Sequence, residues 1–234
     1  MRLLIVNRKT LYLILLALIL ILTIFIVVQR RDKVEDVFNT DIIYQGNKDE
    51  KIIAFACNVD WGNEYIRGML DVFKEKDIKI TFFITGRWAE KHNDLVKLIY
   101  DEGHEIGNHG FQHIDYDKLD FNRNYEEIKK AHDIIKSITN SSPKYFAPPS
   151  GAYNDNTIKA AKELDYKLIL WSIDTIDWRD DSTKDKIIQR VTEKVHNSGI
   201  VLMHPTENTN KALPEIIDYL FEKGYKVGRI SDIL

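Results

Sequence analysis

Short apolar segments of the β type alternate with amphipathic, helix-like segments from Lys51 to the end of the chain. The first pair is KIIAFACNV (51–59) and NEYIRGMLDVFKEKD (63–77), in which Ile66, Leu70 and Phe73 share one face. Strands that alternate with helices form parallel sheets with right-handed crossovers. Seven such units are too regular for an α+β fold and too many for a small open sheet. The pattern predicts an α/β fold, a closed or nearly closed parallel (β/α) barrel. Its strands are expected at 51–59, 79–85, 104–109, 144–149, 167–173, 200–204 and 225–230.

The amino-terminal segment LYLILLALILILTIFIVVQ (11–29) carries no charge and is long enough to cross a hydrocarbon core of ~30 Å as a helix. Basic residues precede it, which places residues 1–10 in the cytoplasm and the rest of the chain outside. A cleaved signal peptide is the alternative, but IVVQRRDK offers no small residues at the exit. We therefore predict a single-pass transmembrane anchor at 11–29, a tether at 30–50 and an extracytoplasmic barrel domain at 51–234, held at the cell membrane.

The charge of the main domain limits its partners. From Asp32 onward 28 basic residues face 36 acidic ones, a net charge of −8, which argues against binding to nucleic acid. The one cysteine, Cys57, excludes an internal disulfide and lies in an apolar run, as a buried inert thiol would. The domain is expected to be a monomer.

Unusual polar and aromatic residues follow the apolar segments, where a (β/α) barrel carries its chemistry. The first predicted strand is followed by Asn58, Asp60 and Trp61, and the third by His109 and His113. The fourth is followed by Pro148, Pro149 and Ser150. The fifth is followed by Asp174, Asp177 and Trp178, and the sixth by His204.

The segment GHEIGNHGFQH (103–113) holds three of the seven histidines. His109 and His113 are four residues apart, so a helical turn lets both bind one cation. Asp60 would complete a set of two histidines and one carboxylate, and this set predicts a divalent metal, with Zn2+ as the first choice. Asp60 acting as a general base, with only two protein ligands on the metal, is the alternative. We expect His104 to make a structural hydrogen bond.

His204 ends the segment GIVLMH, so its side chain should project into the same pocket. Imidazole suits a general acid at neutral pH, although a polar residue that merely ends a strand is the simpler interpretation. Trp178 and Tyr153 could form the wall of a sugar site by stacking, or serve only in packing.

From Lys51 to Leu234 the chain resembles the polysaccharide deacetylase family, also called the NodB-homology domain or carbohydrate esterase family four. GHEIGNHGFQH resembles the family's second motif, which implies that His109 and His113 bind the metal. APPSGAYN (147–154) resembles the third motif, which implies a substrate-binding role for Pro149 and Ser150, with the Ser150 backbone N–H at the oxyanion.

Two further segments extend this resemblance. DTIDW (174–178) is similar to the fourth motif and IVLMH (200–204) to the fifth, with Leu202 lining the acetyl pocket and His204 as the acid. The family implies a distorted (β/α) barrel, a divalent ion such as Zn2+, and N-acetylated glycans such as peptidoglycan or chitin-like chains as partners.

Two positions depart from the family's pattern. Its first motif usually reads Thr-Phe-Asp-Asp-Gly, the first Asp being the catalytic base, and the equivalent stretch here is FACNVDWG. Some spore-associated members read Asp-Ile-Ser-Trp-Gly, and alignment on Trp61 puts Asn58 in the base position. Ala147 stands where the third motif normally begins with an Arg that pairs with the fourth-motif Asp. Asp177 is therefore expected to lack its usual partner.

Three functions remain open from the sequence. The first is a membrane-anchored, metal-dependent hydrolase that removes N-acetyl groups from a cell-wall or chitin-like polysaccharide. The second is a catalytically degenerate relative that binds the glycan, which Asn58 and Ala147 favour. The third is a metal-dependent hydrolase of another acyl substrate. The presence of His109, His113 and His204 favours an enzyme, because a pure binder needs no acid.

Overall fold

The computed structural model describes residues 8–9, 12, 16–23, 25 and 42–234, and the chain divides into two units, Met1–Thr40 and Asp41–Leu234. Among the residues described, no helix is both long and apolar enough to cross a membrane. Much of the anchor predicted at 11–29 lies outside the described residues.

The second unit is built on one curled sheet in which every strand pairing is parallel, as predicted. Within the described residues eight strands follow the order β1-β6-β5-β4-β3-β2-β8-β7, and a ninth strand, β9, pairs with the amino-terminal half of β2. Their bounds are β1 Ile42–Ile43, β2 Ile52–Val59, β3 Thr81–Ile84, β4 Glu105–Asn108, β5 Tyr145–Phe146, β6 Lys167–Ile169, β7 Ile173–Asp174, β8 Ile200–Met203 and β9 Lys226–Gly228.

The prediction of a closed or nearly closed, distorted seven-stranded barrel is confirmed in part: the sheet is curled and parallel, but it is not closed, and the single strand expected at 167–173 is two strands. β6 pairs with β5 and β1, whereas β7 pairs with β8, so the chain changes partners between Leu170 and Ser172. The Leu170 N–H donates to Ile43 and the Ser172 N–H donates to Ile200. The sheet is therefore a distorted, open barrel whose end strands are β1 and β7.

The segment assigned to the tether contributes to this fold. β1 pairs with β6, and Gln45 forms an antiparallel bridge with Gly199, so residues 42–45 lie between β6 and the start of β8. The compact unit accordingly begins at Asp41, before the predicted boundary at Lys51.

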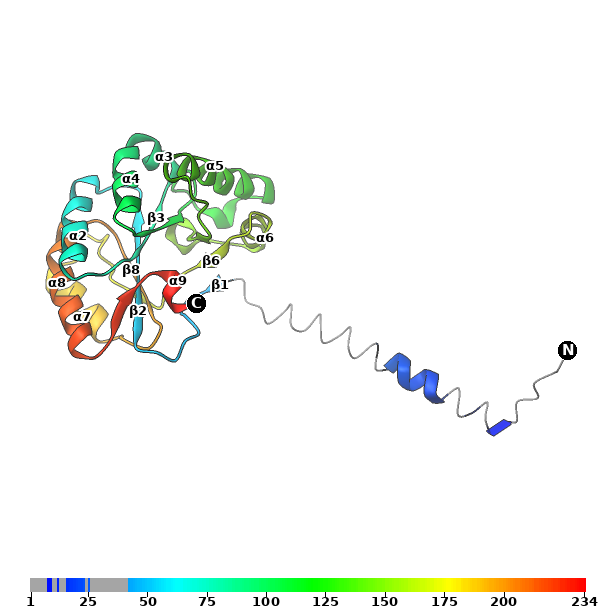
Figure 1. Cartoon of the computed structure of the whole chain (residues 1–234). Coiled ribbons are helices and arrows are strands. Elements are labelled where there is room, and N and C mark those ends of the chain that lie inside the picture. Colours follow the sequence, from blue (N-terminus) through cyan, green and yellow to red (C-terminus); the bar gives the residue numbers. More distant parts are fainter. Residues whose placement is uncertain (1–7, 10–11, 13–15, 24, 26–41) are drawn as a thin grey trace. The chain divides into compact units, whose positions relative to one another are not determined.

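Helices cover the outer face of the sheet (Figure 1). The segment expected as one helix at 89–103 is two helices, α3 and α4, which meet at His92. Side-chain caps begin several helices: Asp120, Asn154, Thr183 and Thr206 each accept a backbone N–H of the first turn. The helices are α2 Asn63–Glu75, α3 Gly86–Lys91, α4 Asn93–Asp101, α5 Phe121–Thr139, α6 Asp155–Glu163, α7 Lys184–Thr192, α8 Glu207–Glu222 and α9 Ile230–Ile233, with 3-10 turns η1 Tyr116–Lys118 and η2 Pro149–Gly151.

The alternation of side chains along β2 separates the core from the site. Phe55 and Cys57 belong to the cluster that packs under the helices, whereas Ala54 and Ala56 belong to the smaller cluster inside the sheet. Because successive strand residues point to opposite faces, Asn58 continues the inner row. Cys57 is buried, and burial raises the pKa of its thiol, as expected for an inert cysteine.

His104 has the structural role predicted for it. It is buried against Phe73 and Phe82, and its Nδ1 accepts the backbone N–H of Ile80 at 3.1 Å. Burial lowers the pKa of His104 to about 4, so the ring is neutral at pH 7.

Candidate active site

The residues that follow the parallel strands surround one cavity of about 400 Å³. Parallel strands bring their carboxyl ends to the same edge of the sheet, so side chains distant in sequence meet there. The cavity is lined by Asn58, Trp61, His113, Ser150, Trp171, Asp174, Trp178, Leu202 and His204. Its lining therefore includes many of the site residues proposed from the sequence.

His204 is held at the cavity by a buried carboxylate. The Asp177 carboxylate accepts hydrogen bonds from the ring Nδ1 and from the backbone N–H of His204, both at 2.7 Å. The Thr209 hydroxyl donates to the same carboxylate at 2.6 Å. On the open side, the indole of Trp61 is stacked on the imidazole, with ring centroids 5.9 Å apart and planes within 6°. Asp177 thus accepts three hydrogen bonds, from His204 and Thr209, while Ala147 stands at the position expected for its usual arginine partner.

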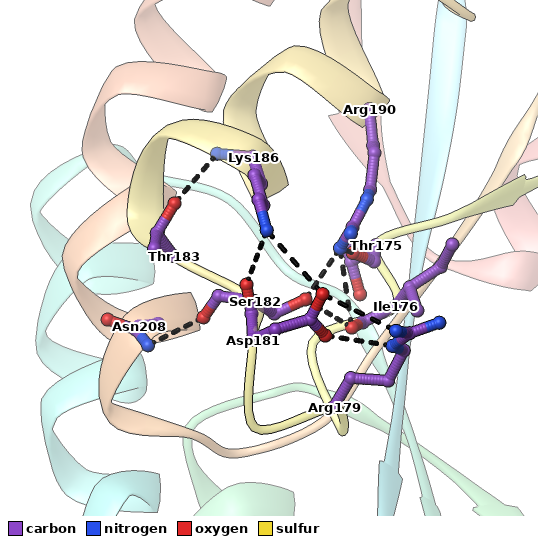
Figure 2. Close-up of polar contacts among 9 residues, drawn as sticks. All are labelled: Thr175, Ile176, Arg179, Asp181, Ser182, Thr183, Lys186, Arg190 and Asn208. Atoms are coloured by element: carbon purple, nitrogen blue, oxygen red, sulfur yellow. Dashed lines mark hydrogen bonds and ion pairs between the residues drawn. The ribbon is translucent and has the colours of Figure 1, made fainter.

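A strained turn places Asp177. Ile176 has φ 51°, in the left-handed region that a β-branched residue rarely occupies. Its N–H donates to Asp174 at 2.7 Å, and Ser182 donates its hydroxyl to the Ile176 carbonyl at 2.5 Å. Figure 2 shows the side chain of Arg190, from α7, reaching the same turn. It donates to the Thr175 carbonyl at 2.7 Å, to Ser182 Oγ at 2.6 Å and to the Ile176 carbonyl at 3.3 Å. These bonds keep the backbone in a conformation that Ile176 alone disfavours.

The loops that follow β2 and β8 are in direct backbone contact. Gly62 has φ 75°, and a Cβ on it would lie 2.1 Å from the carbonyl oxygen of Pro205. Only glycine fits this position. The close approach of Gly62 to Pro205 keeps Trp61 beside His204.

His109 and His113 lie together at the end of β4, with ring centroids 5.4 Å apart. His109 is buried, and its Nδ1 donates to the Ala147 carbonyl at 2.6 Å, which leaves Nε2 free to act as a ligand. Burial, together with the neighbouring His113, lowers the pKa of His109 to about 3; burial also lowers the pKa of His113. Neutral imidazole is the form that binds metals, so these two residues fit a divalent ion.

Asp60, the third predicted ligand, is paired with an arginine. Arg87 Nε donates to Oδ1 at 2.7 Å, Arg87 Nη2 forms an ion pair with Oδ2, and the Thr85 hydroxyl donates to Oδ1 at 2.7 Å. Burial alone would raise the pKa of Asp60, but the hydrogen bonds from Arg87 and Thr85 outweigh it and lower the pKa. In the described part of the chain, no three His, Cys, Asp or Glu side chains are grouped to hold a metal ion. The predicted set of Asp60, His109 and His113 is therefore not assembled in this arrangement.

Asn58 lines the cavity, and its amide oxygen is buried without a hydrogen-bond partner among the described residues. An amide oxygen has no basic lone pair near neutral pH, so Asn58 can hold a water but cannot take its proton. Ala147 is buried, and its contacts are made by its backbone: its carbonyl accepts from His109 and its N–H donates to the Asn108 carbonyl.

The remaining predicted residues differ in position. Pro149 is the buried first residue of the 3-10 turn, whereas Ser150 is exposed at the cavity with φ 57°. Trp178, which is 58% exposed, and Leu202, which is buried, both line the cavity. The Tyr153 hydroxyl is hydrogen-bonded to that of Tyr44 at 2.9 Å, and Tyr153 is not part of the cavity lining.

Sequence reasoning missed Trp171, Thr85 and Arg87 entirely and left Trp61 and Asp174 without a role. Trp171 was hidden inside an apolar run taken for one strand. Thr85 and Arg87 directly follow β3, so the rule that strand ends carry chemistry could have found them.

Comparisons with known proteins show the family to which the chain belongs. Residues 45–169 match the family model described as polysaccharide deacetylase. The chain is 31% identical to the peptidoglycan-N-acetylmuramic acid deacetylase PdaA of Bacillus subtilis, covering 83% of this chain and 75% of that protein. It is 39% identical to the uncharacterized protein YlxY of Bacillus subtilis over 82% of this chain, and spans 60% of the length of that relative.

A solved structure is also similar, that of a CE4 family pseudoenzyme from Bacillus anthracis. The TM-score is 0.80 at 39% identity, covering 82% of this chain and 68% of that one. A mutant of that pseudoenzyme with restored enzymatic activity also matches, with a TM-score of 0.80. The fold and the site define a carbohydrate deacetylase-type α/β domain. The chain belongs to the polysaccharide deacetylase family.

Proposed function

We propose that this protein binds N-acetylated cell-wall glycan in the cavity and removes acetyl groups from it. The observation that carries the proposal is the imidazole of His204, fixed at the cavity by Asp177 and Thr209. A protein that only binds a glycan has no need of an imidazole with one nitrogen locked to a buried carboxylate. The names of the peptidoglycan deacetylase relatives support the choice of substrate.

Each part of the cavity has a task in this reaction. Trp61, Trp171 and Trp178 offer aromatic faces to sugar rings, and Leu202 offers an apolar contact to the acetyl methyl group. The Ser150 backbone N–H is proposed to donate to the oxyanion, and His204 to protonate the leaving amine.

His109 and His113 would hold a divalent ion, for which Zn2+ is the first candidate. Such an ion, when bound, supplies Lewis-acid polarisation of a carbonyl and a water of lowered pKa. Asn58 would orient such a water by hydrogen bonding, and the proton of the water would pass to solvent because the amide cannot accept it.

The test is acetate release from N-acetylglucosamine oligomers and from peptidoglycan, with and without chelator. We expect acetate to be released by the parent, and the rate of release to be lower in the presence of chelator and in the His204→Ala variant. Release from an unrelated acyl ester only would instead support a hydrolase of another acyl substrate.

A glycan-binding protein without turnover is the second candidate. Two observations favour it: Asn58 occupies the base position, and Asp60 is bound to Arg87. Saturable binding of the oligomer with no acetate released at any metal concentration would establish this function.

We also propose that residues 11–29 anchor the protein in the cell membrane, with the domain outside and acting as a monomer. The uncharged apolar run with basic residues before it supports this orientation. Protease added to intact spheroplasts should remove the domain. Full protection would mean the opposite orientation or no anchor.

A further inference from the structure

Arg87 supplies the positive charge that pairs with Asp60 in the candidate active site. Its guanidinium bonds to both oxygens of Asp60, through Nε at 2.7 Å and through Nη2. Thr85 adds a third hydrogen bond to the carboxylate at 2.7 Å. Asp60 therefore accepts three hydrogen bonds from protein side chains, and its own side chain is only 8% exposed.

The backbone that carries Arg87 is fixed to the loop between the two histidines. The Gly86 N–H donates to the Gly110 carbonyl at 2.8 Å, and the Arg87 N–H donates to the Phe111 carbonyl at 3.0 Å. The side chain, by contrast, is 46% exposed, so it can leave the carboxylate for solvent without disturbing that loop. The backbone of Arg87 is thus held close to His109 and His113, while its guanidinium can exchange between Asp60 and solvent.

From this geometry we propose that Arg87 competes with a divalent ion for Asp60 and so sets the metal affinity of the site. Arg87 and Thr85 use three of the about four acceptor positions of the Asp60 carboxylate, and a divalent ion on the same carboxylate is repelled by the guanidinium. Metal binding at His109, His113 and Asp60 therefore weakens the Arg87–Asp60 pair. This inference deepens the proposed function and depends on its divalent-ion site, but not on turnover.

The test measures Zn2+ binding to the full-length protein by competition with a chromogenic chelator, without any glycan. We expect Arg87→Ala to bind Zn2+ roughly tenfold or more tightly than the parent, because a charge-assisted hydrogen-bond pair no longer has to be weakened. Arg229→Ala is the matched control, since Arg229 is 41% exposed and also pairs with a carboxylate through two nitrogens, that of Asp232, and neither residue lines the cavity. Its Zn2+ affinity should equal that of the parent.

Two further measurements separate the possible outcomes. In Arg87→Ala combined with Asp60→Asn the gain in affinity should vanish; if it survives, the ion does not use Asp60 and the proposal fails. The Zn2+-induced rise in Tm should be larger in Arg87→Ala than in the parent, which also reveals a variant that merely folds poorly. Equal or weaker Zn2+ binding by folded Arg87→Ala overturns the inference, whether or not the protein releases acetate.

Discussion

Asp177 accepts hydrogen bonds from both the ring Nδ1 and the backbone N–H of His204, at 2.7 Å each. Because a carboxylate only accepts, the proton on that side of the ring belongs to Nδ1. Nε2 is then the nitrogen that can exchange a proton with a substrate. Asp177 therefore sets the tautomer of His204 as well as its orientation.

Loss of this pair should slow turnover strongly and leave the fold intact. We expect His204→Ala to lower acetate release by roughly 10²–10⁴-fold, the range for removal of a positioned acid. Asp177→Asn should show a similar loss, since an amide can donate to the ring and no longer fixes one tautomer. The double variant should be no worse than His204→Ala, because the two residues act as a unit. Asp181→Asn, in the same loop but exposed, is the control; normal activity in His204→Ala would make the pair structural.

Asn58→Asp should restore the missing base. A carboxylate at this position can accept a proton that the amide cannot, and we expect acetate release to rise by roughly tenfold or more above the parent. Burying an added charge should at the same time lower Tm by several degrees, at about 1 kcal/mol for each 2–4 °C in a protein of this size. Asn58→Ala controls for the loss of the amide. If the parent is inactive and Asn58→Asp gains nothing, the binding function is the better description.

Arg190 is expected to act through the turn at Ile176. Arg190→Ala removes the donor that holds the Thr175 and Ile176 carbonyls, so Asp177 should shift and kcat should fall roughly 10- to 100-fold. Oligosaccharide affinity should change little, because Arg190 does not line the cavity. Arg190→Lys should recover part of the rate, since Lys keeps a donor. The control is Arg179→Ala, which removes an exposed arginine paired with Asp181 in the same turn (Figure 2). This variant should keep the kcat of the parent. An equal fall in both variants would contradict a specific role.

The pH dependence of stability should report His104. Its pKa in the folded protein is about 4, below the ordinary 6.5, so its contribution to stability is fully present above pH 6.5 and is lost as the pH falls toward 4. The full loss is about 3 kcal/mol. His104→Gln keeps an acceptor for the Ile80 N–H and does not titrate. Urea unfolding at pH 7 and pH 4.5 should show the parent losing more stability than this variant. An identical pH dependence in the two proteins would mean that His104 is not buried as a neutral ring.

The order of strands and helices could be predicted because each strand is a short apolar run closed by turn or polar residues. The sheet opening could not, since KLILWSI is continuously apolar and gives no sign that its two halves pair with different strands. β1 was missed for a related reason: it has two paired residues in a polar stretch, and only the uncovered edge of β6 makes it a strand.

The site followed from the sequence where a strand end alone places the residue, as at Asn58, His113 and His204. Pairings between side chains did not follow. Asp177 was expected to lack its usual arginine partner, and no motif predicts that Thr209 and the backbone of His204 donate hydrogen bonds to it. The pairing of Arg87 with Asp60 could not be predicted either, because it depends on how closely the segments that follow β2 and β3 approach each other.

Gly62 limits how this protein can be diversified in the laboratory. Random libraries aimed at a faster enzyme would naturally cover the stretch from Asn58 to Gly62, which contains the base position and one wall of the cavity. Every non-glycine residue at 62 meets the Pro205 carbonyl and would push the Trp61 loop away from His204. Such a library would lose most of its members to one position before any improvement at Asn58 could be seen, and a design that holds Gly62 constant would recover them.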